Sequence, residues 1–587
     1  MNRNVILCLL FGWLSCFTFV PNTTGFAAAS ATAKPVTPKD AHKALLTVFT
    51  YDADGKLLAT GTGFFINEKG DGAAAFHLFK GASRAEVVDW KGNRLPVLRI
   101  LGAVENYDLV TFTTPGAKKL FSMTIAGCVS VDTATTLSLI RPTTEKKPLP
   151  QSVRVTTVED FDEYKYLSIN AANDSANFAC PLLNAEGGVV AITQQNVTPE
   201  AATLNAIDAR FLQKMTVNST AAFNADLQAI RIPKALPADA EDALTFVYMM
   251  SYKDSLQAIT ACNDFLQAYP DHTEAYVCRG SLLARKQQYA AAEADFTTAM
   301  EKAKLPGSGW RSDEVHGALS KLIYQQVTGA APGLPESWTL QRAYDEAVAA
   351  ESEHSSPHYR LQQANCLFAM KEYARAYQGF HALGQDPTLQ GEEWSARTRS
   401  ELWFSAVRAW ELSGGDSLQA VVLMDSVMAQ LEKPYSAEDA RFLLERAARL
   451  QRAGEYRRAI ADYNEYERVV GVRQLNDRFY FVREQLELES KMYQQALDDI
   501  QTAMALNPAN PEYPVEQVYI MLRAGLYEDV INACNQYLKT APDNPDYYKF
   551  RGIAEGELGQ KAKARQSLQK AKELGDPTID ALLQRYQ

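Results

Sequence analysis

The sequence lacks three features that would place it in a simple class. It has no basic excess, since 59 Lys and Arg face 70 Asp and Glu for a net charge of −11, which disfavours nucleic acid and anionic lipid as partners. Beyond the N-terminal segment no run of about 18 apolar residues occurs, so we expect no membrane-spanning helix in the mature chain. No signature of a metal or an organic cofactor is present, so we expect none.

The eight cysteines match neither the spacing of a zinc site nor that of a dense disulfide scaffold. Two lie in the first 29 residues. We expect most of the others to be small buried apolar side chains. Cys262 and Cys278 could meet between adjacent helices, but a disulfide needs a geometry that sequence does not give. The six later cysteines are Cys128, Cys180, Cys262, Cys278, Cys366 and Cys534.

Residues 1–29 are typical of an export signal. Arg3 supplies a positive start, residues 5–19 are largely apolar and too short for an ordinary membrane span, and Ala27-Ala28-Ala29 offers small residues for cleavage before Ser30. We therefore expect an exported protein, periplasmic or associated with the cell envelope.

Anchoring as a lipoprotein through Cys16 is an alternative. The preceding residues, Trp13-Leu14-Ser15, fit such a signal poorly because Trp13 is bulky, and the apolar run continues past Cys16. The sequence leaves lipidation open.

Four short strings in residues 42–218 carry the first part of the interpretation. A β-rich run at 45–51 and a turn precede the first string, G-T-G-F-F-I at 61–66. The second string, A-A-A-F-H, ends at His77. Asp108 opens the string D-L-V, and residues 177–183 read N-F-A-C-P-L-L.

In this order the strings resemble trypsin-like serine proteases of the HtrA/Deg type, whose landmarks are G-S-G-F-x-I, T-N-A-H-V-V, D-L-A-V and G-N-S-G-G-P-L-L. The resemblance implies a double β-barrel. It places His77 as the general base and Asp108 as its orienting carboxylate, while Phe178 stands where the nucleophilic serine belongs.

This substitution predicts an inactive protease domain. In the serine mechanism a hydroxyl attacks, His removes its proton, and Asp fixes the imidazole tautomer; Phe178 has nothing with which to attack. The glycines that shape the oxyanion hole are replaced by Ala176, Ala179 and Cys180, so we expect the hole to be distorted or filled.

Two residues could restore a nucleophile. Ser175 lies three residues before the expected position and would project elsewhere, whereas Cys180, two residues after it, would need His77 within hydrogen-bond reach. The simpler interpretation is that Phe178 and Cys180 fill the vacated pocket and that His77 and Asp108 remain as a structural pair.

From about residue 239 the pattern is helical, with a repeat of about 34 residues. Small residues stand where two helices would cross closely, and prolines end the second helices. The clearest unit, 273–306, has Tyr276, Gly280, Leu283, Tyr289, Ala292, Phe296, Ala299 and Pro306. The pattern resembles tetratricopeptide repeats, which implies an all-α superhelix whose concave face binds peptides or proteins. Recurring Gly, Pro and Tyr at this spacing disfavour a heptad coiled coil.

Near the end of the array, Tyr513, Tyr519, Tyr547 and Arg551 form an aromatic and basic set. They are either core and solvated-face residues or a site for a protein partner. The Lys and Asn pattern of a carboxylate clamp does not appear, so a chaperone-tail ligand is not expected.

The sequence therefore predicts a multidomain chain, all-β and then all-α. The expected parts are a signal peptide at 1–29, a trypsin-like pseudoprotease domain at 42–218, a linker at 219–238 and a repeat array at 239–587. We expect about eight hairpins, irregular over 307–356.

The expected function is that of a non-enzymatic adaptor or assembly scaffold of the envelope. The alternatives are an active serine or cysteine peptidase that uses Ser175 or Cys180, and a barrel that only caps the helical stack. The partner and the oligomeric state are not indicated.

Overall fold

The computed structural model describes residue 37 and residues 39–586, apart from 117–119, 128–129, 144–148, 162, 197 and 199–200. The expected signal peptide and the lipidation candidate Cys16 lie outside the described residues, as does Cys128. The described chain divides into two compact units. One contains residues up to 322 together with 330–336, and the other contains 323–329 and 337–586.

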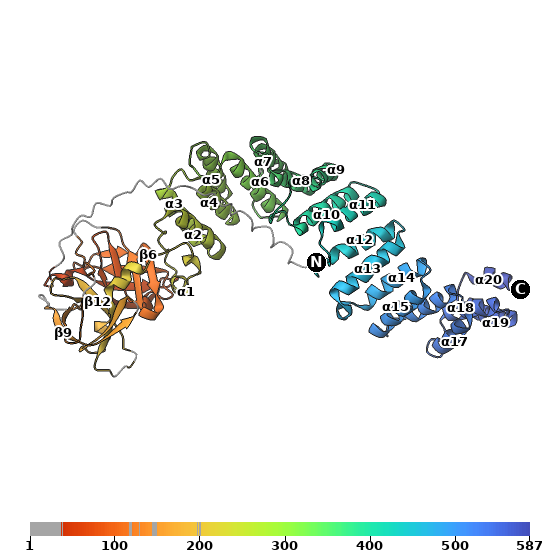
Figure 1. The fold of residues 1–587 in the computed structure, drawn as a ribbon, viewed down its shortest axis with the longest axis horizontal. Coiled ribbons are helices and arrows are strands. Elements are labelled where there is room, and N and C mark those ends of the chain that lie inside the picture. The colour runs from red at the N-terminus through yellow and green to blue at the C-terminus, as the bar shows by residue number, and fades with distance from the viewer. Residues whose placement is uncertain are drawn as a thin grey trace. The chain divides into compact units, whose positions relative to one another are not determined.

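The first unit begins with a seven-stranded antiparallel sheet, a half-barrel, in the order β5-β4-β1-β2-β3-β7-β6 (Figure 1). In β1 the buried side chains include Leu46 and Val48, which alternate with more exposed ones as in a sheet with one covered face. The Asp52 carboxylate accepts hydrogen bonds from the amides of Asp54 and Lys56 and so forms the turn into β2. The strands are β1 (Leu45–Tyr51), β2 (Leu57–Phe65), β3 (Asp71–Ala74), β4 (Arg84–Val88), β5 (Arg94–Pro96), β6 (Arg99–Val104) and β7 (Leu109–Thr113).

A closed six-stranded barrel follows, in the order β10-β13-β12-β11-β8-β9. Every residue of β12 is buried, which fits a strand covered on both faces. The strands are β8 (Thr136–Leu139), β9 (Gln151–Phe161), β10 (Tyr164–Ile169), β11 (Pro181–Leu183), β12 (Val189–Gln194) and β13 (Leu204–Asp208). The expected order of β before α is therefore confirmed at this level.

Residues 219–238, expected as a linker, are hydrogen-bonded to the first sheet. The amide of Ile100 in β6 donates to the Pro233 carbonyl at 2.9 Å, and Ala235 donates back to Ile100 at 2.8 Å. Arg231 donates to Ala82 at 2.8 Å. These bonds fix the chain as it enters α2.

One hydrophobic core runs from the first sheet into the first helices. It includes Val48 and Phe112 of the sheet and Phe246, Phe265 and Ala275 of the helices, each at most 1% exposed. The helices are α1 (Ala225–Gln228), α2 (Ala240–Lys253), α3 (Ser255–Ala268), α4 (Thr273–Arg285) and α5 (Tyr289–Lys302). The β region and these hairpins thus share their interior.

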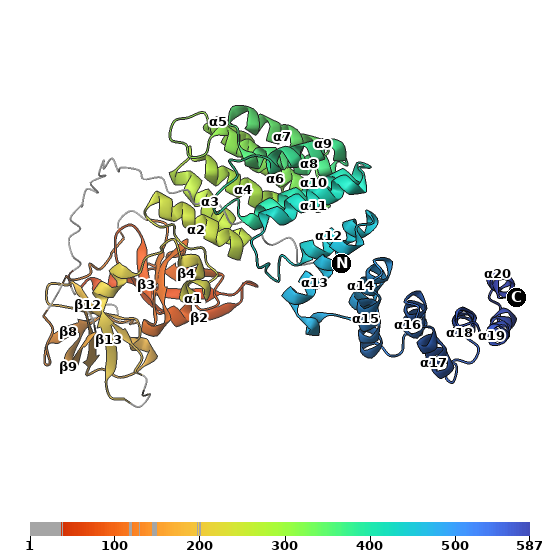
Figure 2. The ribbon, with the colours of Figure 1, turned by 45° about the vertical axis from the view of Figure 1, so that its right-hand side comes forward.

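The rest of the described chain is helical. Figure 2 shows the later hairpins following one another in chain order. Helices α6 and α7 occupy the stretch where the repeat is irregular. The helices are α6 (Ser312–Thr328), α7 (Leu340–Glu353), α8 (Pro357–Ala369), α9 (Tyr373–Gly384), α10 (Ala396–Leu412), α11 (Ser417–Gln430), α12 (Arg441–Arg452), α13 (Tyr456–Val470), α14 (Asp477–Glu489), α15 (Tyr493–Leu506), α16 (Glu512–Arg523), α17 (Tyr527–Tyr537), α18 (Pro545–Glu557), α19 (Lys561–Glu573) and α20 (Ile579–Arg585).

Close helix crossings explain the small residues of the repeat. A Cβ atom at Gly280 of α4 would lie 3.1 Å from the Phe296 ring of α5, and one at Gly552 of α18 would lie 2.7 Å from Leu568 of α19. The helices of each hairpin could not approach so closely with larger residues at these positions.

An arginine ladder links the hairpins. Arg279, Arg446 and Arg483 each bind an aspartate 16 residues later on the second helix of the same hairpin, at 2.6–2.9 Å. Each also contacts an Asn or Asp of the preceding helix. Over the residues that the structure describes, no helix is long and apolar enough to cross a membrane.

Candidate functional site

The structure brings His77 and Asp108 together. Nδ1 of His77 lies 2.7 Å from Oδ2 of Asp108, and the His77 amide donates to Oδ1 at 2.8 Å. His77 lies in a short 3-10 turn, Phe76–Leu78, and Asp108 adopts a left-handed backbone (φ 48°) immediately before β7. The hydrogen bond with Asp108 raises the pKa of His77, because the carboxylate stabilises the imidazolium.

A second contact ties this pair to the closed barrel. The side-chain amide of Gln194, at the end of β12, donates to the backbone carbonyl of Tyr107, the residue before Asp108. Gln194 is buried. The position of Asp108 is therefore set from both sheets.

Phe178 lies in the loop between β10 and β11. Its ring is half-buried and packs against the core of the closed barrel. A phenyl group offers no lone pair, so this position cannot supply a nucleophile.

Two backbone amides of this loop, those of Ala176 and Phe178, form hydrogen bonds within the loop. The Ala176 amide donates to Oδ1 of Asp174 at 3.1 Å, and the Phe178 amide donates to the Ser175 carbonyl at 3.3 Å. Asp174 caps the short 3-10 turn Ser175–Asn177. With both donors engaged inside the loop, neither is aimed at a substrate carbonyl.

The next two residues are fixed against β12. The Ala179 amide donates to the Thr193 carbonyl at 2.9 Å, and the Cys180 amide donates to the Thr193 hydroxyl at 2.9 Å. Ala179 adopts φ 54°, a left-handed conformation that glycine tolerates better. The backbone of Ala179 thus has a conformation that a glycine would adopt with less strain.

Neither alternative nucleophile hydrogen-bonds His77. Cys180 is fully buried in the barrel core, and burial raises the pKa of its thiol to about 12. Ser175 is exposed, and its hydroxyl contacts Oδ1 of Asp174 at 3.4 Å. Within the described part of the chain, no side chain hydrogen-bonds Nε2 of His77.

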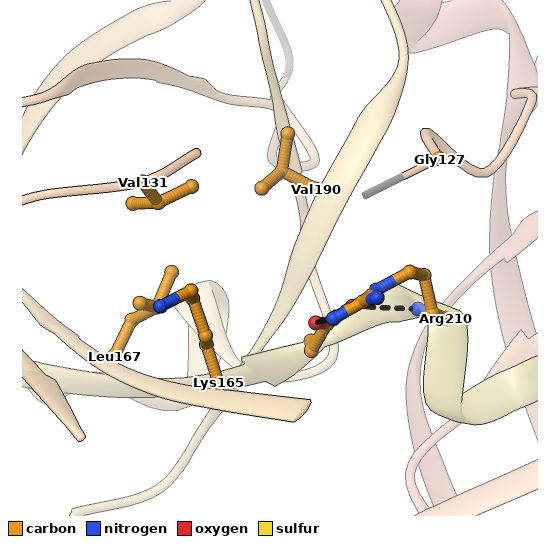
Figure 3. Close-up of a pocket in the computed structure, with 7 residues that line it drawn as sticks. Gly127, Val131, Lys165, Leu167, Val190 and Arg210 are labelled. Carbon is orange, nitrogen blue, oxygen red and sulfur yellow. Dashed lines mark hydrogen bonds and ion pairs between the residues drawn. The ribbon is translucent and has the colours of Figure 1, made fainter. Parts of the chain in front are cut away.

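Figure 3 shows a small cavity of about 10 Å³ at the closed barrel. Arg210 beside it is paired with Asp208, and Lys165 stands opposite. The space is about that of one water molecule. The lining residues are Gly127, Val131, Lys165, Leu167, Val190, Asp208 and Arg210.

The C-terminal aromatic set does not form one exposed cluster. Tyr513 and Tyr547 are each 3% exposed. The Tyr513 hydroxyl donates to Asp477 at 2.6 Å, and the Tyr547 ring stacks on Tyr537 with centroids 5.4 Å apart. These two lie between hairpins.

The other two members are more accessible. Tyr519 is half-buried, contacts the Phe550 ring and accepts a hydrogen bond from Arg523 at 3.0 Å. Arg551 donates to Ser567 and Asn535 at 3.0 and 2.8 Å. Of the four, Tyr519 is the one whose ring reaches the surface.

Sequence reasoning missed two residues that shape the candidate site. Asp174 engages the Ala176 amide, and Gln194 connects the barrel to the backbone beside Asp108. An Asp two residues before a small residue is a capping signal that could have been read. Nothing in the sequence marks Gln194, because its partner is a backbone atom 87 residues away.

Comparison with known proteins gives a limited result. No protein-family model and no curated protein matches the sequence. Among solved structures the chain is similar to "HtrA-type protease AlgW with tripeptide", with 16% identity and a TM-score of 0.26. The similarity covers 30% of this chain and 59% of that one, so the chain spans less than two thirds of that protein's length. At this TM-score the similarity assigns the chain to no family.

Proposed function

We propose that this chain is a non-enzymatic, protein-binding adaptor or assembly scaffold of the cell envelope. It combines a degenerate trypsin-like double β-barrel with a tetratricopeptide superhelix. The trypsin-like assignment is supported by the order of the strings at His77, Asp108 and Phe178. The repeat assignment is supported by helical hairpins that cross at glycine and alanine.

The observation that carries the proposal is the state of the loop at Phe178. A phenylalanine replaces the nucleophile, and the two neighbouring amide donors bond to Asp174 and Ser175 inside the loop. Loss of the nucleophile alone costs on the order of 10⁶ in turnover in a serine protease. The dyad can still hold a proton, but it has no hydroxyl or thiol to activate.

The binding role is assigned to the helical array. Stacked hairpins expose the inner faces of their first helices, and tetratricopeptide arrays commonly bind peptides or proteins there. Tyr519, on the first helix α16, presents a half-buried ring with Arg523 beside it. Such an aromatic and basic pair is typical of residues that contribute strongly to protein interfaces.

The peptidase alternative needs a nucleophile beside His77, and neither of its two candidates hydrogen-bonds that residue. Cys180 would have to become a thiolate, yet burial raises its pKa to about 12. Ser175 would need a base, and its hydroxyl contacts a carboxylate oxygen of Asp174 instead of His77. The other alternative is that the barrel only caps the helical stack. The core shared by the first sheet and α2–α4 supports it, and it is compatible with an adaptor whose partner binds the array.

Affinity capture from native envelope, followed by mass spectrometry, tests the proposal. We expect wild type to retain a specific partner and Tyr519→Ala to retain less of it. Tyr252→Ala serves as the control because Tyr252 is 65% exposed in the other unit. Equal capture by all three proteins would argue against a site at Tyr519, and capture of nothing by wild type would argue against an adaptor.

A further inference from the structure

Helix α14 carries a glutamate where three other first helices have a glycine or an alanine. Four first helices, α4, α8, α14 and α18, are 13 residues long. Their eighth residues are Gly280, Ala364, Glu484 and Gly552. This is the position at which the two helices of a hairpin cross closely. A carboxyl group there departs from the packing rule of the array, and such departures are expected where a site has a function.

Glu484 is fully buried and unsatisfied. Its exposed fraction is 0%, and neither Oε atom has a hydrogen-bond partner. Glu487, one turn later, is 3% exposed and leaves Oε2 without a partner. Burying a carboxylate without a donor is costly, so such a group binds a proton instead.

The charges around the pair are mostly negative. On α14 itself the nearby groups are Arg483 and Glu487, α15 contributes Asp498 and Asp499, α13 contributes Glu467, and α16 contributes Glu516. Glu516, Glu487 and Asp499 act on Glu484, whereas Asp499, Arg483, Asp498 and Glu467 act on Glu487. One cation therefore faces several acids.

That cation is already engaged. Arg483 donates to both carboxylate oxygens of Asp499 at 2.6 and 2.8 Å and to Glu467 at 2.7 Å. Its contact with Glu487 is longer, at 4.0 Å. Burial raises the pKa of Glu484 to about 9, and the carboxyls of Glu516 and Glu487 act in the same direction.

Helix α18 has a buried glutamate at a comparable position, and its carboxylate is hydrogen-bonded. Glu555 is the eleventh residue of α18, as Glu487 is of α14. Glu555 is also buried, but it accepts a hydrogen bond from the Ser567 hydroxyl at 2.8 Å. At this position the side-chain donor that α18 has for its glutamate is therefore missing in α14.

We propose that Glu484 and Glu487 make the junction between α14–α15 and α16 a pH-responsive element of the array. The junction is packed while both carboxyls are protonated and loosens when they ionise at alkaline pH. Opening hydrates the two groups and separates Glu484 from Glu516. This pH-responsive junction is independent of the proposed adaptor function, because it depends only on packing within the helical array.

The direction in which packing of the junction changes with pH follows from proton linkage. A packed state that holds the proton up to about pH 9 binds more protons than an open state that loses it near pH 4.3, so packing weakens as pH rises between these values. The opening constant should grow about tenfold per pH unit for each carboxyl held protonated. Above about pH 9 the dependence on Glu484 levels off.

Hydrogen–deuterium exchange of the full chain at several pH values, corrected for the intrinsic exchange rate, measures this opening constant in α14–α16. Through Glu484 alone, wild type should open about 100-fold more at about pH 8 than at about pH 6. Glu487, whose pKa is raised to about 8, should add a smaller factor. Glu484→Gln, which is neutral and of the same size, should lower the slope by about one power of ten per pH unit. Glu489→Gln, on the exposed last residue of α14, should retain the wild-type slope.

A wild-type slope in Glu484→Gln would overturn the proposal. Should Glu484→Gln fail to fold, Glu484→Gly tests the same prediction, because glycine occupies this position in α4 and α18. Infrared spectroscopy of wild type near pH 7 provides a second readout. We expect the carbonyl band of a protonated carboxylic acid that Glu484→Gln diminishes, and absence of that band would also contradict the proposal.

Discussion

His77 and Asp108 form a hydrogen-bonded pair at the edge of the first sheet. Nδ1 and Oδ2 lie 2.7 Å apart, the arrangement that orients an imidazole for proton transfer. At Phe178 the chain offers nothing to deprotonate. The pair also has a structural role, because the Asp108 carboxylate accepts a hydrogen bond from the His77 amide. It holds the short turn at His77 against β7.

The dyad predicts a titration that depends on Asp108. Asp108→Asn should lower the pKa of His77 towards its ordinary value of about 6.5, because the hydrogen bond that raises it is weakened. The stability gained from this pair is fully present below about pH 6.5 and is lost as pH rises through the raised folded-state pKa. NMR titration of the His77 ring measures the shift. Asp543→Asn, on an exposed carboxylate, should leave the titration unchanged.

Restoring the hydroxyl alone should not restore activity. Phe178→Ser places an Oγ at the nucleophile position, but the Ala176 amide remains bonded to Asp174 and Ala179 and Cys180 still replace glycines. We expect no cleavage of fluorescent casein above background by the purified variant. Turnover by Phe178→Ser that His77→Ala abolishes would show that the loop can still form an oxyanion hole.

The Cys180 thiol should be inert in the folded protein. Burial raises its pKa to about 12, so almost no thiolate exists at pH 8, and the core of the barrel blocks access. Mass spectrometry after iodoacetamide treatment should find the Cys180 peptide unmodified in native protein and alkylated after denaturation. Rapid native alkylation would contradict the described burial.

The first sheet and the first hairpins should be energetically coupled. Arg99 of β6 donates to both oxygens of Asp264 on α3 at 2.6 and 2.7 Å, with about a quarter of each side chain exposed. A double-mutant cycle with alanine should give a coupling of about 1 kcal/mol or more. The more exposed pair Lys80–Glu105 should give at most a few tenths of a kcal/mol. Equal couplings would mean that the Arg99 contact does not join the two parts.

The arginine ladder should contribute strongly to the array. Arg483→Ala leaves the Asp499 carboxylate buried without its partner, which typically costs about 3–5 kcal/mol. Arg478→Ala, on an exposed position of the same helix, should cost less than about 0.5 kcal/mol. Urea unfolding of the two variants provides the comparison, and similar losses would contradict a role for the ladder.

The sequence was informative where the pattern was local. The expected strand at 45–51 coincides with β1, and the 273–306 unit contains α4 and α5 with Gly280 at their crossing. The strings at His77 and Asp108 pointed to two residues that the fold brings into contact, because each string is part of a strand end or turn with a fixed place in the sheet.

The remaining features depend on contacts between distant residues. The orientation of the Ala176 and Phe178 amides depends on the conformation of one loop. The Asp174 side chain contributes to that conformation by accepting a hydrogen bond from the Ala176 amide. Tyr513 and Tyr547 were grouped with Tyr519 by sequence distance, yet they pack between hairpins. The burial of Glu484 depends on how α14 packs against its neighbouring helices, and a helical period alone does not reveal it.

The most direct test of the central claim is intact-mass analysis of the purified chain after treatment with a serine-directed fluorophosphonate, run beside a casein digest. A chain with Phe178 at the nucleophile position and no activated hydroxyl predicts no adduct and no cleavage. An adduct at Ser175, or cleavage that His77→Ala abolishes, would contradict the account and establish a peptidase.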